Sequence, residues 1–164
     1  MPTDRIVRTV DERLVRAPVA RIFELARDVE RWPMRLTHYR WVRMLAPLGD
    51  GTAGVVEMAA WRPFGPAAWP TWWVSEMSVD HAAPAIRFRH IRGITTGMDV
   101  EWTFITRDEG TLARIVHVWN GPGWPVIGRL AARAVIAPVF VHGIASRTLA
   151  GLAAAAERDG DRST

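Results

Sequence analysis

The fold is decided by residues 71–92, which read TWWVSEMSVDHAAPAIRFRHIR. Apolar and polar side chains alternate in the segments EMSV and IRFR, a spacing typical of β-strands that bury one face. The interruption DHAAP at 80–84 has the composition of a turn. The stretch therefore predicts two antiparallel strands, at residues 71–79 and 85–92.

Strand patterns continue on both sides of this hairpin. Further strands are predicted over residues 6–16, 39–45, 52–61, 97–106 and 111–119. A loop is predicted between two of the strands, where the chain contains Pro63, Gly65, Pro66 and Pro70. Asp108-Glu109-Gly110 predicts a tight turn, and the glycines and proline after Asn120 end the sheet.

Helical patterns flank the strands. Apolar residues from Val19 to Val29 recur at helical spacing after Ala17-Pro18, and Trp32-Pro33 ends that helix. A short second helix is predicted at 33–36. Near the end, residues 126–137 and 139–157 are rich in Ala, Leu and Ile, with Pro138 as a kink or a helix start between them.

This order of elements predicts an α+β fold. A strand, two helices and about six further antiparallel strands precede a long helix. Hairpin-length connections favour a curved antiparallel sheet of about seven strands around the C-terminal helix. An internal hydrophobic cavity is expected between the sheet and that helix.

Composition excludes several classes of chemistry. The 164-residue chain has no cysteine, and all 21 of its basic side chains are arginine. Disulfides, thiolate metal sites and Schiff-base lysines are therefore excluded. The net charge is +4, but the arginines are scattered among 17 acidic residues. No nucleic-acid partner is expected.

Other features of the composition concern location and ligands. The N-terminus is charged, and the uncharged run at 134–146 is shorter than the roughly 20 residues of a bilayer span. A cytoplasmic protein without stable membrane insertion is expected. Nine tryptophans accompany one tyrosine, which favours a cavity lined by indole rings.

The element order resembles a known superfamily. Ala17-Pro18 precedes the first helix and DVERWP follows it at 28–33, as in START-like (SRPBCC) proteins with the helix-grip, Bet v 1-like fold. That superfamily includes polyketide cyclases and coenzyme Q-binding proteins. The resemblance covers essentially the whole chain. It implies a single START-like domain over residues 1–158 and a polar tail over 159–164.

A closer resemblance lies in the middle of the chain. Its residues are Trp73-x-Ser75, Asp80, Ile86-x-Phe88-x-His90, Met98-x-x-x-Trp102-x-Phe104, and Tyr39 six residues beyond Pro33. They resemble bacterial aromatase/cyclases of polyketide biosynthesis. In that group a Trp-x-Ser-x-Arg pattern places an arginine in the pocket, thought to hold the polyketide carbonyl. Met77 replaces that arginine here.

Ring closure of a poly-β-ketone needs a base for the α-proton and a donor to the developing oxyanion. The candidate catalytic residues are Tyr39, Ser75, His117 and Arg89. Tyr39 and Ser75 match pocket positions of the resembling group. His117 is a candidate general base near pH 7. Arg89 is a candidate replacement for the missing arginine, with an outward position beside Arg87 as the alternative.

Cavity walls are the expected place of the substrate-binding residues. The candidates are Trp32, Trp73, Met77, Met98, Trp102, Trp119, His142 and Glu57. Core packing is the alternative for Met77, a buried structural histidine for His117 and His142, and a solvent-facing position for Glu57. The histidines show no ligand spacing, so no metal or organic cofactor is expected.

The resemblance, together with the many tryptophans, thus implies a polyketide cyclase/aromatase-like protein that binds a flat hydrophobic polyketide or aromatic ligand, with aldol cyclisation and dehydration as its candidate reaction. The alternative is a non-catalytic carrier of lipids, quinones or other hydrophobic small molecules. An acyl carrier protein is a further candidate partner. A monomer or homodimer is expected.

Overall fold

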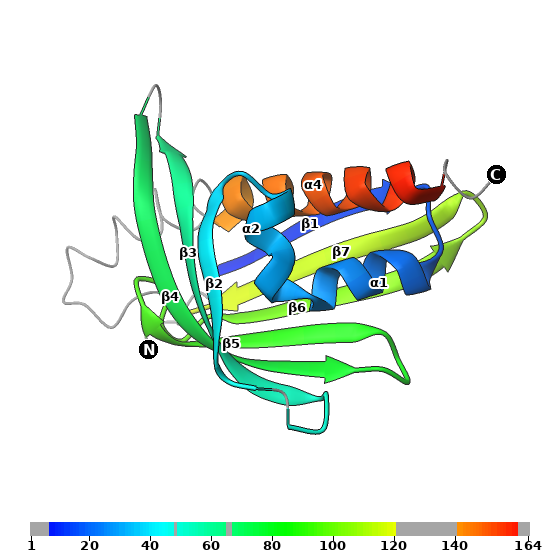
Figure 1. Cartoon of the computed structure of the whole chain (residues 1–164). Helices are drawn as coiled ribbons and strands as arrows, with labels where there is room; N and C mark the ends of the chain where they lie inside the picture. Colours follow the sequence, from blue (N-terminus) through cyan, green and yellow to red (C-terminus); the bar gives the residue numbers. More distant parts are fainter. Residues whose placement is uncertain (1–6, 48, 65–66, 121–140, 161–164) are drawn as a thin grey trace, which may run out of the picture.

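The computed structural model describes residues 7–47, 49–64, 67–120 and 141–160. Its elements follow the predicted order (Figure 1). The strands are β1 Val7–Val15, β2 Tyr39–Ala46, β3 Ala53–Phe64, β4 Ala67–Asp80, β5 Ala85–Gly93, β6 Asp99–Arg107 and β7 Gly110–Trp119. The helices are α1 Val19–Arg27, the 3-10 helix η1 Val29–Arg31, α2 Trp32–Arg35 and α4 His142–Gly160. The predictions for 126–137 and Pro138 lie outside the described residues.

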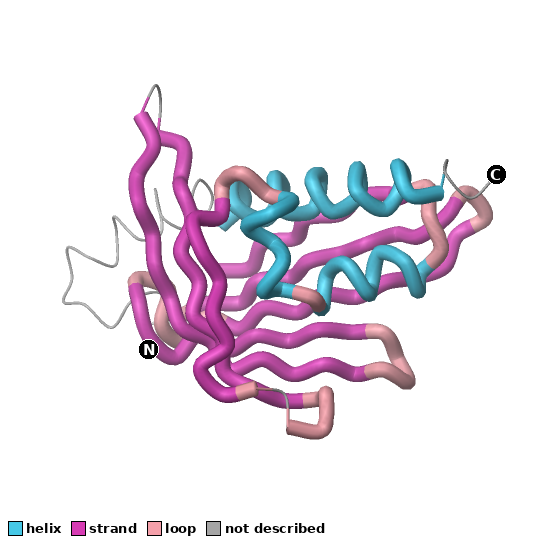
Figure 2. Tube along the Cα trace, viewed as in Figure 1, coloured by secondary structure: helices cyan, strands magenta, loops and turns pink. Residues whose placement is uncertain are grey.

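All seven strands form one antiparallel sheet in the order β1-β7-β6-β5-β4-β3-β2. Strands that are adjacent in the sheet are also consecutive in the sequence, with one exception. The exception is β1, which pairs with β7 along its whole length. The sheet curves around the helices, and α4 crosses its open side in contact with β1 and α1 (Figure 2). The predicted helix-grip architecture is confirmed.

Alternation along the strands places the core on the concave face. In β7 every second residue, from Thr111 to Trp119, is buried. The apolar side chains among them belong to one buried cluster with residues of α1 and α4, including Ile22 and Leu152, which are fully buried. Each such aliphatic side chain contributes about 1.5–3 kcal/mol when it leaves water. None of the described helices has the length and hydropathy that a bilayer span needs.

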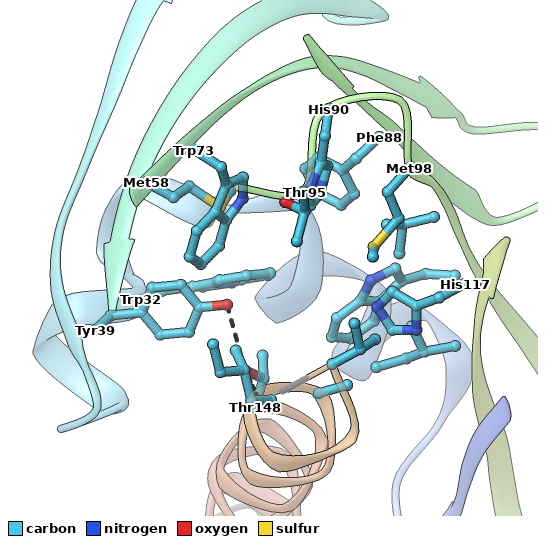
Figure 3. Close-up of a pocket in the computed structure, with 16 residues that line it drawn as sticks. Trp32, Tyr39, Met58, Trp73, Phe88, His90, Thr95, Met98, His117 and Thr148 are labelled. Carbon is cyan, nitrogen blue, oxygen red and sulfur yellow. Dashed lines mark hydrogen bonds between the residues drawn. The ribbon is translucent and has the colours of Figure 1, made fainter. Parts of the chain in front are cut away.

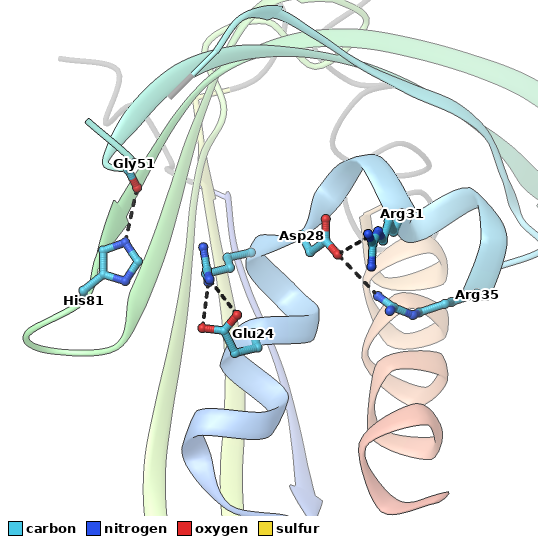
Figure 4. A network of polar contacts seen from close by, with 7 residues as sticks. Glu24, Asp28, Arg31, Arg35, Gly51 and His81 are labelled. Carbon is cyan, nitrogen blue, oxygen red and sulfur yellow. Dashed lines mark hydrogen bonds and ion pairs between the residues drawn. The ribbon is translucent and has the colours of Figure 1, made fainter. Parts of the chain in front are cut away.

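Ion pairs and one buried hydrogen bond lie at the corner between α1 and α2. The Asp28 carboxylate lies 3.6 Å from Arg31 and 3.8 Å from Arg35 (Figure 4). Beneath them the Trp32 indole donates a 3.2 Å hydrogen bond to the Leu25 carbonyl. The corner therefore holds Trp32, only 2% exposed, against the interior.

The loop predicted around Pro63 and Pro70 is wrong, because β3 and β4 extend through both prolines as one long hairpin. The pairing of β3 with β2 ends at Ala60, and that of β4 with β5 ends at Trp73. Each proline therefore lies where its strand has a free edge. A residue without an N–H is tolerated there because no second ladder needs a donor.

A β-bulge lies near the C-terminal end of β5. The β4–β5 register shifts between Val74 and Ser75, so that Ser75 faces His90 and Val74 faces Arg92. Gly93 follows with φ +98°, and a Cβ there would lie 2.4 Å from the Trp72 carbonyl oxygen. Only glycine fits this position. The chain then turns back into β6.

Candidate functional site

A cavity lies between the concave face of the sheet and the first turns of α4 (Figure 3). It is lined by Trp32, Tyr39, Met58, Trp73, Phe88, His90, Thr95, Met98, Val100, Trp102, Ile115, His117, Val141, Ile144, Ala145 and Thr148. Its volume between these residues is about 70 Å³. Pockets for drug-sized ligands measure about 300–1,000 Å³. A multi-ring ligand therefore requires side chains to move apart.

Indole rings form much of the wall. Trp32 from α2 lies 5.7 Å from Trp102 of β6, measured between ring centroids. Trp32 also packs edge-on against Tyr39 at 5.2 Å, and Tyr39 packs against Trp73 of β4 at 6.3 Å. Flat aromatic surfaces favour flat ligands by offset stacking. Three of the nine tryptophans, Trp32, Trp73 and Trp102, therefore line this cavity.

His90 lies at one end of this wall. Its ring stacks on Trp73 with centroids 5.9 Å apart and planes 16° apart. Its Nδ1 lies 2.5 Å from the Thr95 hydroxyl, and its backbone N–H donates to the Met98 carbonyl. Burial lowers the pKa of His90 to about 4, so the ring is neutral at pH 7.

His117 enters the cavity from β7. Burial, and then the proximity of His90, lower its pKa to about 3. The ring is therefore neutral at pH 7 but a weaker base than the sequence analysis expected. Its Nδ1 is buried without a hydrogen-bond partner. An unsatisfied ring nitrogen in an apolar wall is available to a polar group of a ligand.

Tyr39 supplies a phenol from β2. The residue is 7% exposed, and its hydroxyl lies 3.3 Å from that of Thr148 on α4. Burial raises the pKa of Tyr39, so the phenol stays protonated at neutral pH. It can therefore donate to a ligand oxygen.

Among the described residues, no group of three or more His, Asp or Glu side chains could hold a metal ion.

Three further candidates face the concave side but do not line the cavity. Met77 is 1% exposed in the apolar core, and Trp119 is 2% exposed with its indole donating to the Thr96 carbonyl at 3.0 Å. Ser75 is completely buried, and its hydroxyl has no partner. Strand alternation correctly predicted that these side chains face the concave side. It does not indicate which of the inward side chains border the cavity.

Three other candidates point away from the cavity; for Arg89 and Glu57 this is the outward position that the sequence left open as the alternative, and the inward position expected for His142 is not observed. Arg89 forms a 2.8 Å ion pair with Asp99 on the outer face of the sheet. Glu57 lies on the same face and accepts a 2.7 Å hydrogen bond from the Trp72 indole. The His142 side chain is 63% exposed.

The outward positions have physical causes. Arg89 follows the inward Phe88, so alternation directs it outward together with Arg87. Glu57 lies between the inward residues Val56 and Met58 and is outward for the same reason. His142 begins α4 and contacts the buried Asp11 of β1, which holds it beside the sheet edge.

Three polar residues that line the cavity were not among the candidates predicted from the sequence: His90, Thr95 and Thr148. His90 is in phase with the inward Phe88, so alternation contained this signal. Thr148 follows Ile144 and Ala145 at spacings of four and three, which places all three on one helix face. Thr95 lies in the turn between β5 and β6, where no periodicity indicates direction.

The sequence matches a known protein family over most of its length. Residues 15–138 match the model of the family described as polyketide cyclase/dehydrase and lipid transport. The chain belongs to this family. A Streptomyces halstedii protein, provisionally named a polyketide cyclase, is 29% identical over 108 residues, which are 65% of this chain and 94% of that protein.

Solved structures of similar fold place the polyketide cyclase/dehydrase chain in the same architecture. TTHA0849 from Thermus thermophilus superposes with a TM-score of 0.74 at 22% identity, covering 90% of this chain and 95% of that one. The Zhui aromatase/cyclase from Streptomyces sp. R1128 superposes with a TM-score of 0.71 at 20% identity, covering 94% and 95%. At these identities the likeness establishes the fold.

Proposed function

We propose that this polyketide cyclase/dehydrase family member binds a flat hydrophobic polyketide or other aromatic molecule in the indole-lined cavity and catalyses its aldol cyclisation and dehydration. The observation that carries the proposal is the convergence of Tyr39, His90 and His117 on a cavity walled by Trp32 and Trp73. A mostly apolar cavity with a few convergent polar groups is the usual form of a small-molecule site.

The proposed roles follow from protonation. Tyr39 remains a phenol, so it donates a hydrogen bond to a ligand carbonyl oxygen and stabilises that oxygen as negative charge develops. His117 presents a neutral ring with a free nitrogen and accepts the α-proton. His117 then gives this proton to the hydroxyl formed at the carbonyl carbon, which leaves as water, and loss of a second α-proton to solvent completes the aromatic ring. This chemistry needs no metal or organic cofactor.

A second candidate is a non-catalytic carrier of lipids, quinones or other hydrophobic molecules. One observation favours it: no arginine, aspartate or glutamate is among the described residues that line the cavity. Met77, in place of the arginine of the resembling aromatase/cyclases, is buried in the core instead. A carrier needs apolar enclosure and no acid or base.

Ligand titration separates the two candidates. Indole fluorescence is followed while aromatic polyketides, quinones or fatty acids are added. Saturable quenching by aromatic polyketides alone supports the cyclase, and quenching by fatty acids or quinones supports the carrier. Trp73→Phe should reduce the quenching. Trp61→Phe is the matched control, because Trp61 lies outside the cavity and is 39% exposed.

Turnover then tests the catalytic part. If cyclisation of a bound poly-β-ketone is observed, Tyr39→Phe should lower the rate by about 10²-fold while binding persists, because the donor to the oxyanion is lost. His117→Gln should act in the same direction. Unchanged turnover in both variants would remove these residues from the mechanism.

The proposal includes delivery of the polyketide by an acyl carrier protein in the cytoplasm, to a monomeric or homodimeric protein. Size-exclusion chromatography with light scattering measures the oligomeric state. Mixing with a carrier protein that bears an acyl chain should shift the elution volume. No shift, combined with binding of the free polyketide, would exclude the carrier protein but retain the ligand.

A further inference from the structure

A chain of polar side chains leaves the cavity through its wall. The Tyr39 hydroxyl lies 3.3 Å from the Thr148 hydroxyl, as the dashed line in Figure 3 shows. The same Thr148 oxygen lies 3.0 Å from His38 Nε2. The three residues come from the turn before β2, from β2 itself and from α4. They connect segments 110 residues apart in the sequence.

Thr148 is suited to pass a proton because its hydroxyl oxygen has three hydrogen-bonding neighbours but carries only one proton. Besides Tyr39 and His38, it contacts the Ile144 carbonyl at 2.8 Å. A threonine hydroxyl has one proton and two lone pairs, and it rotates about the Cβ–Oγ bond. In one orientation it donates to Ile144. In another it donates to Tyr39 while accepting from the N–H of His38.

His38 forms the outer end of the chain. It lines a surface hollow together with Thr37, Trp61, Ala68 and Arg147, here called the outer hollow. Burial and then the charge of Arg147 lower the pKa of His38 to about 4, so the ring is neutral at pH 7. A neutral imidazole donates at one nitrogen and accepts at the other. His38 therefore has a donor for Thr148 and an acceptor for water.

We propose that His38 and Thr148 are a proton relay that connects the outer hollow to the Tyr39 hydroxyl in the cavity. Tyr39 gives its proton to an oxygen of the bound molecule, and the Thr148 proton moves to the Tyr39 oxygen. The Nε2 proton of His38 moves to Thr148, and Nδ1 takes one proton from hydronium in the outer hollow, which leaves water.

The other two histidines at the cavity do not offer this route. His90 is hydrogen-bonded to Thr95, and Nδ1 of His117 is buried without a partner. Neither of them lines the outer hollow. His38 alone among the described histidines contacts both the outer hollow and a residue that lines the cavity. His38 and Thr148 are thus positioning residues that act through Tyr39.

The relay rests on the proposed function only for the destination of the proton, and its test needs no ligand. Tyr39 is the only tyrosine of the chain. Tyrosine labelled with ¹³C at Cζ therefore gives one NMR signal. In a mixture of H₂O and D₂O this signal splits if the hydroxyl exchanges slowly and is averaged if it exchanges fast.

The wild-type protein should show the averaged signal. Thr148→Val, of nearly the same shape without the hydroxyl, should slow exchange on the order of tenfold or more, because exchange must then wait for local opening. His38→Phe should slow it similarly with Thr148 intact. Thr148→Ser should restore the wild-type rate. Thr95→Val, which removes a different hydroxyl from the same cavity, should leave the Tyr39 exchange rate unchanged.

Two outcomes would overturn the relay. Equal exchange rates in all variants would show that protons reach Tyr39 by another route. Slow exchange in Thr148→Val but not in His38→Phe would show that Thr148 only anchors the phenol. Failure of the protein to bind polyketides would leave these rates as they are, so the two proposals fail separately. Unfolding curves recorded by indole fluorescence verify that each variant is folded.

Discussion

Titratable side chains on the two faces of β5 have opposite environments. On the concave face, Phe88 and His90 lie in an apolar wall, and the imidazole is neutral. On the outer face, one residue away, the side chains of Arg87 and Arg89 are exposed to water. They are paired with Glu101 at 2.7 Å and Asp99 at 2.8 Å.

This difference arises from solvent rather than from residue type. Burial disfavours the charged form of a histidine and moves its pKa downward. Exposure leaves a guanidinium hydrated, so its ion pair adds little to stability. On β5, therefore, the polar side chain that faces the interior is one that can be neutral, and the outer face has no such requirement.

The largest expected effect comes from placing a charge on the concave face. Met77→Arg would put a guanidinium at a position that is 1% exposed. An unpaired buried charge should destabilise the fold by about 3–5 kcal/mol. Urea unfolding followed by indole fluorescence measures this loss.

Arg89→Met is the matched reverse change on the outer face. It should alter stability by about 1 kcal/mol or less, because the pair with Asp99 is exposed. A Met77→Arg variant as stable as Arg89→Met would contradict the contrast between the faces. It would show that the core near Met77 admits water or an acidic partner.

A smaller effect should follow from acidification. The pKa values of His90 and His117 fall from the ordinary 6.5 to about 4 and about 3 in the folded protein. Between pH 6.5 and pH 4 the unfolded chain binds more protons, so stability is complete above pH 6.5 and falls as the pH is lowered. Each histidine should account for on the order of 1–3 kcal/mol.

Unfolding free energies measured from pH 7 to pH 4 test this dependence. His117→Phe should flatten the acid side of the profile, since one buried imidazole no longer needs to stay neutral. His81→Gln, in the exposed turn between β4 and β5, is the control for replacing a histidine outside the cavity. Equal slopes in all three proteins would assign the acid sensitivity to other groups.

The smallest effect is expected for the outer ion pair of Arg87 and Glu101. A double-mutant cycle with Arg87→Gln and Glu101→Gln should give a coupling of about 0.2–1 kcal/mol that weakens as salt is added. A coupling above about 2 kcal/mol that resists salt would mean that this pair is shielded from water.

Much of this contrast could be predicted from the sequence, because the alternation of apolar and polar residues along a strand indicates which side chains face inward. It placed Trp73, Met98 and Trp102 inward, and the structure confirms all three. It left Glu57 open, since its neighbours Val55 and Ala59 on the same face are apolar and small. An apolar outer face offers no contrast for alternation to detect.

Two other properties depend on contacts between distant segments. Ser75 and Met77 are inward as alternation predicts, but the packing of α4 against the sheet decides how far the cavity extends. His142 is held by Asp11, which lies at the opposite end of the sequence. No local spacing encodes either contact, so the residues that close the cavity could not be chosen from patterns alone.

The pairing of the first strand with the last has a consequence during synthesis. The Thr111 hydroxyl donates a 2.7 Å hydrogen bond to the Ala17 carbonyl across 94 residues. Since ribosomes add about 5–20 residues per second, β1 waits several seconds for its partner. Its exposed Val10 and Leu14 remain available to chaperones or to other nascent chains during that interval. Translation speed between the codons for β1 and β7 should therefore influence the yield of folded protein.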